Sequence, residues 1–79
     1  MRVKVLFFGA TADAVGQRDI VVDVSDETTV NQAVAKVVSE YSQLSTHKLL
    51  FALNEEYVDG DKPVSQGDEL AIFTAVSGG

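Results

Sequence analysis

The stretch TVNQAVAKVVSEY, residues 29–41, decides the fold, because its apolar residues recur at the spacing of a long helix. Thr29 and Gln32 form a capping box: the threonine hydroxyl can accept the Gln32 amide proton, and the Gln32 side chain can reach back to the Thr29 amide. The apolar positions that follow are Val30, Ala33, Val34, Val37, Val38 and Tyr41. We therefore predict an amphipathic helix of about three turns that packs by one face.

The segments on both sides of this helix are typical of strands. Residues 3–8 and 18–24 precede it, and residues 49–53, 56–58 and 69–74 follow it. Each is short, rich in apolar or β-branched side chains, and bounded by turn residues. We expect residues 42–47 to form a polar connection and Asn54-Glu55 to form a hairpin turn. The first two are joined by a short connection, which favours antiparallel pairing.

This order of elements predicts an α+β fold, in which a mixed sheet carries one main helix packed on one face. The first and last strands can pair in parallel at the centre of the sheet, which is the β-grasp, or ubiquitin-like, arrangement. We divide the chain into a β-grasp domain over residues 1–74 and a flexible C-terminal tail over residues 75–79 that ends in Gly-Gly.

Composition narrows the classes of partner. The chain has 79 residues, no cysteine and a net charge of −6. Nucleic acid is not an expected partner, because phosphate binding needs a basic surface, whereas a basic protein partner would be attracted. The apolar run after Met1 stops at Gly9, too short to cross a membrane. We expect a cytoplasmic protein that does not bind membranes.

The terminal glycines suggest a chemical use. Gly78 and Gly79 have no Cβ, so they can enter a slot too narrow for other residues and bring the main-chain carboxylate close to a reactive phosphate. The tail can reach ~16 Å when extended. A carboxylate needs activation, for which ATP could supply an adenylate, yet the sequence has no Gly-rich phosphate loop. A separate activating enzyme is therefore expected, unless the glycines are only a frayed terminus.

Alternation along the first strand places Leu6 and Phe8 on the same face as Lys4, which we take as the solvent side. If Leu70 of the last strand points to the core, Phe73 joins that outer face. Exposed aromatic side chains on a sheet commonly mark a protein interface. We predict partner binding by these apolar residues, although a small second core that covers them is the alternative.

The remaining polar residues give no pattern of a catalytic or metal site. His47 is the sole histidine, and no partners stand at ligand spacing from it, so we expect a solvated loop residue. Glu55, Asp59 and Asp61 do not have the spacing of a calcium-binding EF-hand loop. We predict no metal site.

Several motifs along nearly the whole chain give a resemblance to a known family. They are V-K-V-L-F-F at 3–8, Val15-Gly16, Thr29-Val30, Leu53-Asn54, G-D-E-L-A-I-F at 67–73 and V-S-G-G at 76–79. On these motifs the chain resembles the small subunits of molybdopterin synthase, which are ubiquitin-like sulfur carriers. It departs from the family at Thr74-Ala75, where two prolines are common.

The resemblance implies a two-enzyme cycle. A ubiquitin-activating-like adenylyltransferase would use ATP to adenylate Gly79, and sulfur would replace one oxygen to give a thiocarboxylate. The tail, with Gly78 and the partner-binding Val76, would enter the large subunit of the synthase and donate sulfur to cyclic pyranopterin monophosphate. The large subunit would supply the catalytic side chains, in a heterotetramer. The chain itself would bind no cofactor and would be an enzyme only as the small subunit of this sulfurtransferase.

Two other classes of function stay open at this point. One is a related ubiquitin-like carrier, for thiamine or another sulfur product, or a modifier that conjugates to lysines. The other is a β-grasp binding module with an inert tail.

Overall fold

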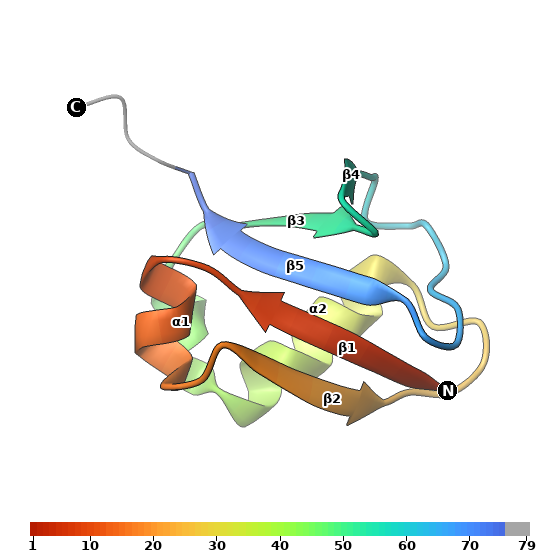
Figure 1. Cartoon of the computed structure of the whole chain (residues 1–79), viewed down its shortest axis with the longest axis horizontal. Helices are drawn as coiled ribbons and strands as arrows, with labels where there is room; N and C mark the ends of the chain where they lie inside the picture. The colour runs from red at the N-terminus through yellow and green to blue at the C-terminus, as the bar shows by residue number, and fades with distance from the viewer. Residues whose placement is uncertain (76–79) are drawn as a thin grey trace.

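Within residues 1–75, which the computed structural model describes, five strands form one mixed sheet and α2 packs across one face of it (Figure 1). The strand order is β2-β1-β5-β3-β4. The elements are β1 (Arg2–Phe7), α1 (Ala10–Val15), β2 (Asp19–Asp23), α2 (Val30–Glu40), the 3₁₀ helix η1 (Ser42–Thr46), β3 (Leu49–Leu53), β4 (Glu56–Tyr57) and β5 (Glu69–Thr74).

The first and last strands pair in parallel at the centre of the sheet, as predicted. Their register runs from Lys4 opposite Glu69 to Phe7 opposite Ile72. β2 flanks β1 and β3 flanks β5, and both pairs are antiparallel. This topology confirms the α+β, β-grasp fold.

The predicted capping box at the start of α2 is present. The Gln32 amide donates to Thr29 Oγ1 over 3.2 Å, and the Thr29 amide donates to Gln32 Oε1 over 2.9 Å. Two amides that an uncapped helix would leave without partners are therefore satisfied. The valines of α2 have only modest helix propensity, so packing against the sheet supplies much of the stability of this helix.

The core lies between α2 and the sheet. Its fully buried side chains come from the inward faces of β1 and β5, from α2 and from η1: Val3, Val5, Val30, Ala33, Val37, Leu44, Leu70 and Ile72. No helix among residues 1–75 has the length and apolar character needed to cross a membrane.

The segment after α2 differs from its prediction as a polar connection. It forms η1, and Leu44 within it is 0% exposed and belongs to the core. A single apolar residue in a short 3₁₀ helix leaves no periodicity in the sequence, which is why the pattern did not indicate it.

The hairpin between β3 and β4 has the turn that the sequence indicated. Asn54 and Glu55 have φ values of 51° and 69°. Two successive residues with positive φ are typical of the type I′ turn, whose twist matches that of the flanking strands. The turn fixes the register of β4, which sets Ala52 opposite Tyr57.

Candidate functional site: an open sheet face beside the C-terminal tail

The face of the sheet opposite α2 carries a row of apolar side chains. Leu6 of β1 lies opposite Ala71 of β5, Ala71 lies opposite Ala52 of β3, and Ala52 lies opposite Tyr57 of β4. Directly opposed residues share a face of a sheet, so these four form one continuous row. Leu50 and Phe73 form a second opposed pair on the same face. We call these six residues the open face.

Two aromatic rings give the open face its shape. The rings of Tyr57 and Phe73 pack edge to face, with their centroids 6.0 Å apart. Tyr57 is 80% exposed, whereas Phe73 is half-buried. Exposed aromatic surface of this kind is typical of the centre of a protein interface.

The structure places the predicted partner-binding residues as follows. Leu6 and Phe73 both lie on the open face, as alternation predicted. Phe8 directly follows β1 and is 54% exposed. Val76 lies outside the described residues. Sequence reasoning missed Tyr57. A two-residue turn at Asn54-Glu55 sets residues that are equally far from the turn opposite one another, and this rule could have placed Tyr57 opposite Ala52.

The tail begins at the same edge of the sheet as Phe8 and Phe73. Because β1 and β5 are parallel, both strands end at one edge of the sheet (Figure 1). Phe8 stands at the end of β1, and Phe73 stands one residue before the end of β5 at Thr74. The proposed reactive groups, Gly78 and Gly79, follow Ala75 and lie outside the described residues.

The opposite end of the open face is charged. Lys4 lies opposite Glu69, and the Nε atom of Arg2 lies 3.5 Å from Asp23 Oδ1. Both members of the Arg2–Asp23 pair are highly exposed, so the pair adds little to stability. Along β1 and β5 the face is thus apolar toward the tail and charged at the far end, whereas β2 adds Asp19 opposite Leu6 and the exposed Val21 opposite Lys4.

The side chains of residues 1–75 offer little chemistry of their own. No group of three or more His, Cys, Asp and Glu in this range could hold a metal ion. His47 is exposed in a loop after η1. The Asp68 carboxylate accepts hydrogen bonds from the Ser65 amide and from Asn54 Nδ2, so it serves the turn before β5.

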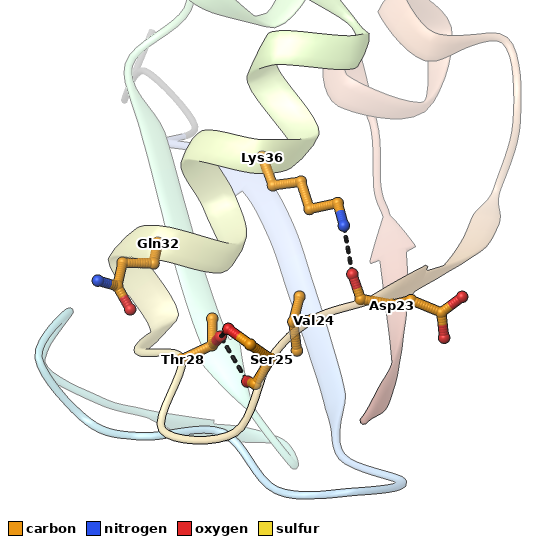
Figure 2. A pocket seen from close by; sticks show the side chains of 6 residues that line it. All are labelled: Asp23, Val24, Ser25, Thr28, Gln32 and Lys36. Carbon is orange, nitrogen blue, oxygen red and sulfur yellow. Dashed lines mark hydrogen bonds between the residues drawn. The ribbon is translucent and has the colours of Figure 1, made fainter.

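Figure 2 shows a shallow hollow between the end of β2 and the start of α2. The ammonium group of Lys36 donates to the carbonyl of Asp23, and the hydroxyl of Thr28 donates to the carbonyl of Ser25 over 2.6 Å. These groups already have partners within the protein. The hollow is therefore accounted for by local structure, and the open face with the adjoining tail is the stronger candidate site.

Within residues 1–75, the parallel β1–β5 pair at the centre of the sheet and the one long helix, α2, packed on one face define a ubiquitin-like β-grasp domain. Among solved structures, the chain is similar to SAMP1 from Haloferax volcanii, with 27% identity, a TM-score of 0.89 and all of both chains covered. It also shares its fold with a chain of the complex of subunits 1 and 2 of molybdopterin-converting factor from Helicobacter pylori, with 23% identity, a TM-score of 0.73 and full coverage of both chains.

The model of the ThiS family matches residues 5–79. The chain belongs to the ThiS family. Two of its relatives are named molybdopterin synthase sulfur carrier subunit. The relative from Dictyostelium discoideum is 35% identical over 96% of this chain and 94% of its own length. The relative from Escherichia coli K12 is 34% identical over 98% of this chain and 99% of its own length. The resemblance seen in the sequence motifs is thereby confirmed.

Proposed function

We propose that this chain is the sulfur carrier subunit of a molybdopterin synthase. The observation that carries the proposal is its identity of 35% and 34%, along nearly the whole chain, to relatives of that name. The terminal Gly78-Gly79 and the open face beside the tail fit the same role.

The reactive group is the main-chain carboxylate of Gly79. An oxygen of this carboxylate attacks the α-phosphorus of ATP on a separate adenylyltransferase, releasing pyrophosphate and forming an acyl adenylate. Hydrosulfide, HS⁻, then attacks the acyl carbon and displaces AMP, and loss of its proton leaves the thiocarboxylate. Transfer of this sulfur to cyclic pyranopterin monophosphate, with water supplying the replacing oxygen, returns the carboxylate.

The open face is the surface that we expect the large subunit to bind. Its apolar end, with Tyr57 and Phe73, adjoins the point where the tail leaves β5. A partner that covers this end is therefore well placed to receive the tail. The net charge of −6 favours a partner with a basic rim, since opposite charges raise the rate of encounter.

The division of labour between subunits follows from the same features. The carrier contributes a loaded main-chain end, and the large subunit contributes the catalytic side chains. Each product takes up two sulfur atoms, so two carriers act per product, and we expect a heterotetramer. We place this assembly in the cytoplasm.

The test has two stages. First, the chain is incubated with the adenylyltransferase, ATP and a sulfur donor. Intact mass spectrometry then measures whether the mass of the chain rises by the difference between one sulfur atom and one oxygen atom. Omission of ATP is the control, and it should leave the mass unchanged. Second, the loaded chain is mixed with the large subunit and cyclic pyranopterin monophosphate. Molybdopterin should form; loading without complex or product would point instead to a carrier for another sulfur product, such as thiamine.

A second candidate is a protein modifier. It is favoured by the 27% identity of the whole chain to SAMP1 and by a further structure of small archaeal modifier protein 1 from the same species, 26% identical over 95% of this chain. In this case the activated Gly79 would form an amide with a lysine of another protein. ATP-dependent conjugates of increased mass, lost when Gly79 is deleted, would support it.

A further inference from the structure

The hydrogen bonds between the parallel strands β1 and β5 are longer at the end nearest the tail than at the start of the strands. At the start of the strands, the Lys4 amide donates to the carbonyl of Asp68 over 2.9 Å. The equivalent bond four residues later, from the Phe8 amide to the carbonyl of Ile72, has lengthened to 3.4 Å. A direct hydrogen bond of this length is weak, so it holds the end of β1 to β5 only loosely.

The hydroxyl of Thr11 provides a second link between these two strand ends. Thr11 is 0% exposed, and its Oγ1 lies 3.0 Å from the Phe8 amide and 2.8 Å from the carbonyl oxygen of Ile72. A hydroxyl can accept one hydrogen bond while it donates another. Oγ1 thus accepts from Phe8, and its single proton is within hydrogen-bond distance of the Ile72 carbonyl, so that one atom can join the two strands. The carbonyl of Phe8, 2.8 Å away, competes for the same proton but also receives the Thr11 amide.

A tight turn brings Thr11 to this place. The chain reverses at Gly9, whose φ of 59° and ψ of −126° suit glycine and few other residues. A Cβ at Gly9 would meet nothing within 4 Å, so the backbone conformation rather than space requires glycine. The turn closes with the Thr11 amide 3.3 Å from the Phe8 carbonyl, at the start of α1.

We propose that Thr11 is a positioning residue for the docking end of the open face. Its hydroxyl fixes the main chain of Phe8 relative to Ile72, and Ile72 is followed directly by Phe73. The exposed ring of Phe8 and the point from which the tail continues are thereby held as one rigid unit. This role rests on the proposed function, because the partner concerned is the large subunit.

The test compares Thr11→Val, which removes the hydroxyl and keeps the shape, with Thr11→Ser, which keeps the hydroxyl. Thr28→Val is the matched control, because Thr28 is also a buried threonine whose hydroxyl donates to a main-chain carbonyl, in the connection between β2 and α2. Three quantities are measured: the melting temperature, the dissociation constant for the large subunit, and the exchange rate of the Phe8 amide together with the N–H residual dipolar couplings of Phe8 and Phe73.

We expect Thr11→Val to weaken binding about tenfold and to speed exchange of the Phe8 amide about tenfold, the effect of losing one hydrogen bond. Thr11→Ser should restore both values. Thr28→Val should bind the large subunit as the wild type does, even if its melting temperature falls as much as that of Thr11→Val. Wild-type affinity in Thr11→Val, or an equal loss in Thr28→Val, would overturn the positioning role.

The free protein separates this inference from the proposed function. If the wild-type chain fails to bind the large subunit, the proposed partner is wrong. The exchange rate and dipolar couplings still decide whether Thr11 fixes the end of the two strands, because they need no partner. Unchanged couplings and exchange in Thr11→Val would then overturn the inference on their own.

Discussion

The ring of Tyr57 stands edge-on to the ring of Phe73, at an interplanar angle of 64°. The two residues come from strands that are not neighbours, since β3 lies between β4 and β5. The contact therefore depends on the register of the hairpin as well as on that of the sheet centre. It gives the open face a rigid aromatic ridge whose phenol can still hydrogen-bond to a partner.

Placing a charge on this ridge should break the complex. We expect Phe73→Asp to weaken binding of the large subunit by about thirtyfold or more, because an interface aromatic of this kind contributes about 2 kcal/mol and a buried carboxylate adds a desolvation penalty. Isothermal titration calorimetry measures the effect. Ala35→Asp, with the same added charge on the exposed side of α2, should bind normally. Equal affinity in the two variants would remove the open face as the docking surface.

Deletion of Gly79 should separate chemistry from folding. Among residues 1–75 the last strand, β5, ends at Thr74, so we expect the loss of the terminal residue to leave the described strand pairing intact. We expect loading by the adenylyltransferase to be abolished in the mass assay, while the melting temperature stays within the error of the wild type. Ser77→Ala, which keeps the terminal carboxylate, should load normally. A large drop in stability on deletion would contradict this division between domain and tail.

Truncation of Leu44 should show how much the fold depends on η1. Leu44 is fully buried, so Leu44→Ala leaves a cavity and should cost about 2–5 kcal/mol of unfolding free energy. That is a large part of the total of about 5–15 kcal/mol for a native domain. Urea denaturation gives the value. Leu44→Met keeps most of the volume and should cost less than about 1.5 kcal/mol; a loss as large as that of alanine would mean that cavity formation is not the cause.

Loss of the helix cap should have a smaller and purely structural effect. Thr29→Ala removes the oxygen that accepts the Gln32 amide, so we expect a loss of about 1 kcal/mol, or about 4–8 °C in melting temperature. Ser39→Ala, at an exposed position within α2, should not destabilise the protein. Thermal unfolding by circular dichroism checks both. A neutral Thr29→Ala would mean that packing of α2 alone sets its start.

The sequence allowed much of the fold to be predicted, because its signals were local. The capping box at Thr29 fixed the start of α2, and the Asn54-Glu55 turn fixed the hairpin. Strict alternation in the first strand separated the buried Val3 and Val5 from Lys4 on the outer face. Each of these features depends on residues close together in the chain.

The features that escaped prediction depend on pairs far apart in the chain. Tyr57 meets Phe73 only after the registers of several strands are set. The hydroxyl of Thr11 finds Ile72 across a sequence separation of 61 residues. Leu44 is a lone apolar residue in a polar segment, so no periodicity marks it. Gly79, by contrast, stays a prediction from the sequence, and the chemistry proposed for it needs no spatial partner within the domain.

The central place of β5 also bears on how the molecule is made. A nascent chain on the ribosome that has reached only residue 68 carries two separate hairpins and lacks Leu70 and Ile72, both of which are fully buried in the finished protein. Closure of the sheet must therefore wait until translation has passed Thr74. We expect products that stop before β5 to lack a closed core and to be open to proteolysis. The architecture thus ensures that whatever molecule presents itself for activation has been synthesised through its final strand.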